Sequence, residues 1–203
     1  MDYAMRLNQI IDIAGKGQEN LDYSNYESQA ELDVLKNANV FLTTSVLGMK
    51  AISHVIEDQA VSLGGSFRFY SAFQRYSRAK LQQQRYNNIL ATNNPVYLFG
   101  IPDVPLWQNP NLIEVNLEEP VLQDRPYLAQ NWFVILHNPQ FVSMALVSRE
   151  IPNSLRPVGA PDKLVYRNFE GFWTYDKDVI TQVVEILDGY IGHKLGNQVY
   201  GLS

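Results

Sequence analysis

The sequence predicts an α/β fold: a single domain with a mixed, roughly five-stranded sheet flanked by helices, plus a helical N-terminal arm. Helical and strand-like segments alternate along the chain, which is typical of this class. An early strand–helix–strand order predicts parallel strands, and a later hairpin predicts antiparallel ones. The chain has 203 residues, of which 46% are hydrophobic and 18% charged, so it can bury one sizeable core.

The arm is predicted to comprise residues 1–38 and to contain two helices. Apolar residues recur at helical spacing from Tyr3 to Ala14, and the glycines around Lys16 end that helix. Ser24 and Glu27 form a capping-box pattern for a second helix that runs to about Lys36. The few apolar residues of the arm must pack on the main domain or on a second copy of the chain, so a homodimer is one hypothesis.

The main domain is predicted over residues 39–195, with a short tail over residues 196–203. Its first helix has an apolar stripe of Leu47, Ala51, Val55 and Ile56, and further helices are expected over residues 76–91 and from Asp176 onward. Alternating or continuous apolar runs predict the strands. These strands are Ser66–Phe73, Val96–Ile101, Leu112–Leu117, Trp132–Leu136 and Phe141–Ser148, the last two forming a hairpin. Residues 152–163 are expected to form a loop, and residues 169–175 an aromatic cluster before the last helix.

Composition excludes several classes of function. The chain has no cysteine, which excludes disulfides, iron–sulfur clusters and cysteine nucleophiles. A net charge of −5 argues against nucleic acid as a partner. The first 20 residues lack a signal-peptide pattern, and no apolar run approaches the length of about 20 residues that spans a bilayer. We therefore expect a cytoplasmic protein with no membrane insertion.

Several local motifs stand in an order that resembles the DICT domain, a sensory module of diguanylate cyclases and two-component systems. The motifs are the helix Met49–Asp58, the strand end Ala72–Arg75, the strand Val96–Ile101, the hairpin around Asn138-Pro139-Gln140, and Gly171–Tyr175 before the last helix. Together they cover roughly residues 40–195. The resemblance implies an α/β fold and a role in bacterial, largely cyanobacterial, signalling, with a suggested link to light responses.

The resemblance implies no catalytic residues, and we expect no enzyme activity. Such domains are often joined to an output domain, whereas this sequence has only a short tail after residue 195. We therefore expect a module that senses a ligand or docks on a partner protein and relays the signal by contact. The alternative is an interaction or assembly subunit of a larger complex that senses nothing. The identity of a ligand or cofactor stays open.

Seven side chains are candidate ligand contacts. The polar candidates are Glu57, Asp58, Gln74 and Arg75, and the candidates for an apolar wall are Trp132, Phe172 and Trp173. Glu57 or Asp58 is expected to pair with Arg75 at the end of the neighbouring strand. The competing interpretation is that the carboxylates lie on a solvated helix face and that the aromatic rings only pack in the core.

A metal site and a basic patch are the other candidates. His54, Glu57 and Asp58 share one helical face, but two carboxylates and one imidazole need further ligands, so we expect no metal ion. Residues 66–94 contain five basic residues and no acidic one, whereas residues 103–124 contain five acidic residues and no basic one. Arg68, Arg78, Lys80 and Arg85 are therefore candidate contacts for an acidic protein partner, unless they simply balance the acidic segment.

Overall fold

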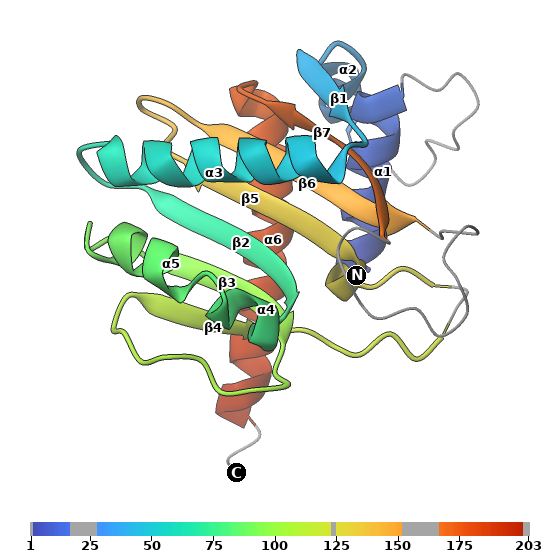
Figure 1. Ribbon diagram of the computed structural model, residues 1–203. Helices are drawn as coiled ribbons and strands as arrows, with labels where there is room; N and C mark the ends of the chain where they lie inside the picture. The colour runs from blue at the N-terminus through green and yellow to red at the C-terminus, as the bar shows by residue number, and fades with distance from the viewer. Residues whose placement is uncertain (1, 17–27, 123–124, 152–166, 201–203) are drawn as a thin grey trace.

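A computed structural model describes residues 2–16, 28–122, 125–151 and 167–200 of the chain. Within them, seven strands form one mixed sheet in the order β1-β7-β6-β5-β2-β3-β4 (Figure 1). The strands are β1 (Val40–Thr43), β2 (Arg68–Arg75), β3 (Val96–Ile101), β4 (Leu112–Asn116), β5 (Asn131–His137), β6 (Met144–Ile151) and β7 (Asn168–Thr174). The pairs β2–β3 and β3–β4 are parallel, and the other neighbours are antiparallel.

Helices cover both faces of the sheet. On one face lie α1 (Tyr3–Lys16), α2 (Gln29–Lys36) and α6 (Lys177–Tyr200), and on the other lie α3 (Val46–Ser62), α4 (Tyr76–Lys80) and α5 (Gln83–Leu90). Because successive side chains of a strand point to opposite faces, β5 sends Phe133 and Ile135 into the first core and Val134 and Leu136 into the second. The predicted α/β class with a mixed sheet is confirmed.

The expected number of strands was wrong, because β1 and β7 were not recognised. β1 has only four residues and lies at the edge of the sheet, so its sequence is too short to establish an alternation. β7 contains three of the four aromatic residues that were predicted to form a cluster, and it pairs with β1 and β6. Gly171 is needed there, because a Cβ atom would lie 2.2 Å from the carbonyl oxygen of Val147.

Three predicted segments have different boundaries in the structure. The helix expected over residues 76–91 is two helices, because the backbone leaves the helical region at Gln82. The second strand of the hairpin starts at Met144, since Asn138 accepts hydrogen bonds from the backbone N–H groups of Gln140 and Phe141 and extends the turn. The capping box at Ser24 lies outside the described residues, and α2 is instead capped by Ser28.

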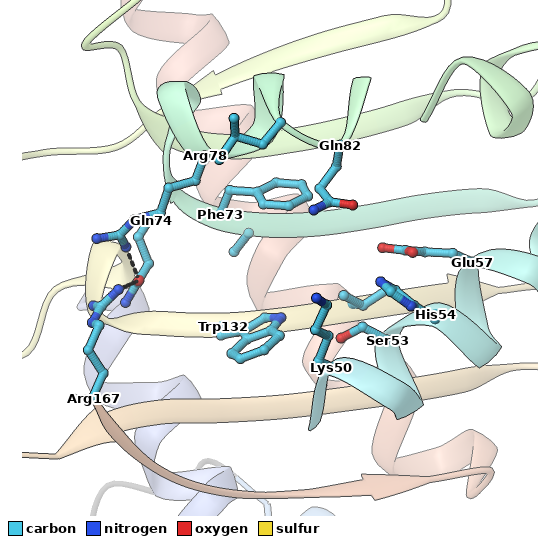
Figure 2. Close-up of a pocket in the computed structure, with 13 residues that line it drawn as sticks. Lys50, Ser53, His54, Glu57, Phe73, Gln74, Arg78, Gln82, Trp132 and Arg167 are labelled. Atoms are coloured by element: carbon cyan, nitrogen blue, oxygen red, sulfur yellow. Dashed lines mark hydrogen bonds between the residues drawn. The ribbon is translucent and has the colours of Figure 1, made fainter. Parts of the chain in front are cut away.

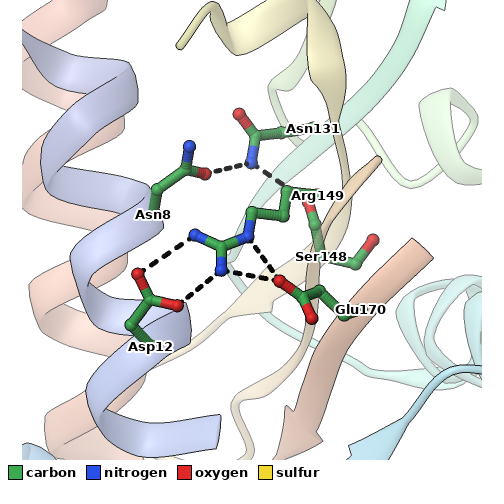
Figure 3. Close-up of polar contacts among 6 residues, drawn as sticks. All are labelled: Asn8, Asp12, Asn131, Ser148, Arg149 and Glu170. Carbon is green, nitrogen blue, oxygen red and sulfur yellow. Dashed lines mark hydrogen bonds and ion pairs between the residues drawn. The ribbon is translucent and has the colours of Figure 1, made fainter. Parts of the chain in front are cut away.

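The N-terminal helix α1 packs on the main domain through both apolar and charged contacts. Its apolar side belongs to the same core as α6, and a polar network fixes it to the sheet (Figure 3). Arg149 of β6 contacts Asp12 of α1 at 2.5 and 3.1 Å and donates to Glu170 of β7 at 2.8 Å. Asn131 donates to Asn8 at 3.1 Å. The helix is thus an integral layer of the fold.

Candidate functional site

A cavity of about 300 Å³ lies on the sheet face covered by α3, α4 and α5 (Figure 2). Its walls come from α3, from the junction between β2 and α4, from β5, and from Arg167, which precedes β7. The volume is at the lower end of the range of about 300–1,000 Å³ found for small-molecule sites. The described residues that line the cavity are Lys50, Ser53, His54, Glu57, Ala72, Phe73, Gln74, Arg78, Leu81, Gln82, Trp132, Val134 and Arg167.

A bulge in β2 supplies two consecutive side chains to the cavity. The pairing register between β2 and β3 shifts between Ala72 and Gln74, and Gln74 has a φ of 67°. Such a bulge breaks the alternation of the strand, so Phe73 and Gln74 both line the cavity. A left-handed conformation at a residue other than glycine costs about 1 kcal/mol or more and is concentrated at functional sites.

The side chain of Gln74 organises the basic end of the cavity. Its Oε1 accepts hydrogen bonds from Arg78 and Arg167, both at 2.5 Å, and its Nε2 donates to Glu150 at 3.3 Å. Arg167 is 9% exposed and also forms a two-pronged ion pair with Glu150. Two guanidinium groups therefore meet at the amide oxygen of Gln74 at this end of the cavity, and Glu150 pairs with the one of Arg167.

α3 contributes polar side chains to the cavity, and its predicted apolar stripe is mostly exposed. The predicted apolar stripe faces outward: Leu47 is 80% and Val55 is 55% exposed, although Ile56 is buried. Ser53 and Glu57, each 4% exposed, take the inward positions one turn apart. The competing interpretation, in which Glu57 lies on a solvated helix face, is therefore wrong.

Two buried oxygen atoms on this wall have no hydrogen-bond partner among the described residues: Ser53 Oγ and Glu57 Oε2. The other carboxylate oxygen of Glu57 accepts from Tyr86, whose hydroxyl is in turn 2.6 Å from Ser71 Oγ. Burial raises the pKa of Glu57 to about 7, although Arg85, 3.3 Å away, and the Tyr86 hydroxyl act to lower it. Near neutral pH this carboxyl is thus poised between its two protonation states.

His54 and Lys50 complete the α3 side of the cavity. Partial burial, followed by the positive charges of Arg85 and Lys50, lowers the pKa of His54. The imidazole is therefore neutral at neutral pH. The ammonium of Lys50 makes no hydrogen bond or ion pair with any residue in the described part of the chain.

Aromatic side chains lie between the two polar ends (Figure 2). Trp132 contacts Phe169 edge-on at a ring distance of 5.5 Å, and Phe73 contacts Tyr86 edge-on at 5.2 Å. These contacts fix the planes of both rings, and Val134 and Leu81 add aliphatic surface. The middle of the cavity is thus suited to a flat apolar group.

Of the seven predicted ligand contacts, the structure brings three together in the cavity: Glu57, Gln74 and Trp132. Asp58 is 69% exposed and pairs with Arg85. Phe172 is buried in the core on the opposite face of the sheet, and Trp173 stacks on Phe41 at the sheet edge. No single feature of the sequence identified Arg167 or Ser53, although Ser53 lies one turn before Glu57 on the predicted helix.

The predicted pairing of Arg75 with Glu57 or Asp58 is wrong. Arg75 follows the bulge and binds Glu119 at 2.8 Å, while Arg85 takes both carboxylates of α3. The other basic candidates for partner binding lie in different places: Arg68 pairs with Asp188 at 2.6 Å, Arg78 lines the cavity and Lys80 is exposed.

Within the described ranges, no three His, Asp or Glu side chains are grouped so that they could hold a metal ion. Among the helices described, none is both long and apolar enough to span a bilayer.

Comparison with known proteins assigns the family. The family model for DICT, described as "Sensory domain in DIguanylate Cyclases and Two-component system", matches residues 23–150. No curated protein and no solved structure gives a significant match. The matched range contains α3, the β2 bulge, α4 and β5, which build most of the cavity wall. This match spans more than half of the chain, and the protein belongs to the DICT family of sensory domains.

Proposed function

We propose that this chain is a bacterial, cytoplasmic sensing module that binds a small molecule in the cavity beneath α3 and relays the signal by contact. The observation that carries the proposal is Ser53 Oγ, a buried oxygen atom on the cavity wall that makes no hydrogen bond with any described residue, beside Glu57, whose Oε2 also makes no hydrogen bond but lies 3.3 Å from Nε of Arg85. A buried polar atom without a hydrogen bond costs about 1–3 kcal/mol. A bound molecule that donates to these atoms removes this cost.

The burial pattern of α3 supports the same proposal, because two polar residues lie on its buried face beside Met49, Ile56 and Ala60. A helix that turns Leu47 and Val55 to solvent and buries Ser53 and Glu57 loses hydrophobic free energy. Conflicts between local pattern and global fold are concentrated at functional sites. We therefore interpret the buried polar face of α3 as a binding surface for a ligand.

The walls of the cavity suggest how binding is relayed. A molecule in the cavity contacts α3 and the β2–α4 junction at once, so its binding changes how α3 lies on the sheet. The outward stripe of Leu47, Ala51 and Val55 is then the surface that a partner protein reads. The resemblance to the DICT domain suggested a role in light responses. Such a role requires a bound molecule that absorbs visible light.

Native mass spectrometry of the protein purified from its own host tests the proposal. We expect wild-type protein to carry a small molecule in stoichiometric amount, and an absorption spectrum shows whether it is coloured. Ser53→Met, which fills the cavity, should lose it, whereas Val55→Met on the outer face of the same helix should keep it. A wild-type protein of bare polypeptide mass would contradict the proposal.

The second candidate is an interaction subunit without a ligand. It is favoured by the same outward apolar stripe and by the exposed residues Phe41 and Leu42 on the edge strand β1. Under this alternative, Leu47→Glu abolishes co-purification of a partner protein and Ser53→Met leaves it intact. If the chain instead senses a ligand, Ser53→Met should also alter the co-purification of the partner protein.

A further inference from the structure

The cavity beneath α3 has walls that favour a mainly apolar molecule. Apolar atoms make up most of its surface, although many of the described lining residues are polar. Phe73 and Trp132 lie between the α3 side chains and the Gln74 end of the cavity (Figure 2), and Val134 and Leu81 add aliphatic surface. Aromatic walls bind flat rings, and the volume of about 300 Å³ admits only a small molecule. This molecule is the ligand of the proposed sensing function, on which the inference below rests.

The charged groups at the Gln74 end of the cavity are already compensated. Arg167 forms an ion pair with Glu150, and Gln74 Oε1 accepts hydrogen bonds from both Arg167 and Arg78. Neither guanidinium group is therefore a free cation. An anionic ligand would lose its hydration on entering this end and would gain no unpaired partner in return.

The charged groups on the α3 side are compensated as well. Glu57 Oε2 lies 3.3 Å from Nε of Arg85. Partial burial, followed by the positive charges of Arg85 and Lys50, lowers the pKa of His54, so its imidazole is neutral at neutral pH. Lys50 is exposed, so water solvates its ammonium, and an ion pair with it would stabilise a complex little. Among the described lining residues, no buried charge therefore needs a charged ligand as its partner.

Ser53 supplies a polar contact for the ligand. Its Oγ is buried on the cavity wall and makes no hydrogen bond with any described residue. A hydroxyl oxygen accepts a hydrogen bond, and the carboxyl of Glu57 lies one turn farther along the same buried face of α3. An N–H or O–H group suits this wall better than a carbonyl or an ether. We propose that the ligand is an uncharged, mainly apolar ring compound whose N–H or O–H group donates a hydrogen bond to Ser53 Oγ.

Isothermal titration calorimetry of the full chain at neutral pH tests this class with four probes built on one ring system. Indole is uncharged and has an N–H donor, and 1-methylindole lacks the donor. Indole-5-carboxylate keeps the donor and adds an anionic group, whereas 5-(aminomethyl)indole keeps it and adds a cationic one. We expect indole to bind about fivefold tighter than 1-methylindole and about tenfold tighter than either charged probe. Equal or tighter binding of 1-methylindole or of a charged probe would overturn the inference.

Two variants of α3 test the hydrogen bond to Ser53. Ser53→Ala should weaken the binding of indole to that of 1-methylindole and leave 1-methylindole unchanged, which also shows that the cavity is intact. Ser62→Ala, at an exposed serine in the last turn of the same helix, is the matched control and should leave all four affinities unchanged. An Ser53→Ala protein that binds indole as tightly as wild type, or that binds both probes more weakly by the same factor, would contradict the role of Ser53.

Failure of this inference is distinguishable from failure of the proposed function. If no probe binds, or a charged probe binds best, but the protein from its host carries a small molecule that Ser53→Met excludes, the ligand class is wrong and the sensing role stands. If no probe binds and no molecule is carried, both are wrong.

Discussion

Replacing Glu57 by glutamine should remove a pH dependence of stability that the cavity creates. The carboxyl is almost completely buried, and burial raises its pKa from 4.5 to about 7 against the opposing effects of Arg85 and Tyr86. Glutamine keeps the shape of the side chain and cannot ionise. Comparison of the two proteins therefore isolates the ionisation of this one group.

The sign and size of the effect follow from proton binding. Between pH 4.5 and about pH 7 the folded protein holds the Glu57 proton and the unfolded chain releases it. The stabilisation that comes from Glu57 is fully present below pH 4.5, the pKa of this carboxyl in the unfolded chain. It is lost as the pH rises through about 7, the pKa of the carboxyl in the folded protein. A change of one in a pKa corresponds to about 1.4 kcal/mol, so the change in the pKa of Glu57 on folding corresponds to about 3 kcal/mol. The free energy of unfolding of Glu57→Gln minus that of wild type should therefore rise by about 3 kcal/mol from pH 4 to pH 8.

Urea unfolding followed by circular dichroism at several pH values measures this difference. Other titrating groups contribute equally to both proteins and cancel. Asp58→Asn is the matched control, because it removes an exposed carboxylate that pairs with the same Arg85 and should change stability by less than about 1 kcal/mol. A Glu57→Gln curve that runs parallel to wild type from pH 4 to pH 8 would refute the reasoning.

Three further perturbations test the fold and the site. Gly171→Ala should destabilise by about 3 kcal/mol or more in thermal unfolding, because its Cβ atom would lie 2.2 Å from a backbone oxygen, whereas Gly64→Ala, with nothing within 4 Å, should cost less than about 1 kcal/mol. Arg149→Met should cost about 3 kcal/mol in urea unfolding, because it removes a mostly buried guanidinium that pairs with both Asp12 and Glu170, while Arg75→Met at a more exposed pair should cost less than about 1 kcal/mol; equal losses would contradict the ranking. Arg85→Gln should move the pH midpoint of the Glu57 effect upward, since Arg85 lowers the pKa of that carboxyl, and a downward shift would contradict this assignment.

The fold class and most helices and strands could be predicted from the sequence, because hydrophobic residues recur with a clear period in long amphipathic helices and in central strands. It did not reveal β1, whose four residues at a sheet edge are too few to show a period. It also suggested the wrong buried face for α3. Hydrophobicity alone placed Leu47 and Val55 inside, whereas tertiary packing turns them outward.

The candidate site was only partly predictable for the same physical reasons. Glu57 and Gln74 were found because a carboxylate helix precedes a strand that ends in polar residues. The positive φ of Gln74 has no signal in the sequence, since glycine or asparagine is the usual residue there. Arg167 reaches the cavity from a segment 93 residues away from Gln74, and no local pattern links the two.

Fluorine NMR of protein labelled with 5-fluorotryptophan tests the central claim most directly, because the three tryptophans report on three different regions. Trp132 lines the cavity, Trp173 lies at the sheet edge beside Phe41, and Trp107 lies in the loop before β4. Resonances are assigned by replacing each tryptophan with phenylalanine in turn. Adding the small-molecule fraction of a host-cell extract should shift the Trp132 resonance and leave the other two in place. An unchanged Trp132 resonance, or a shift confined to Trp107 or Trp173, would contradict ligand sensing in this cavity.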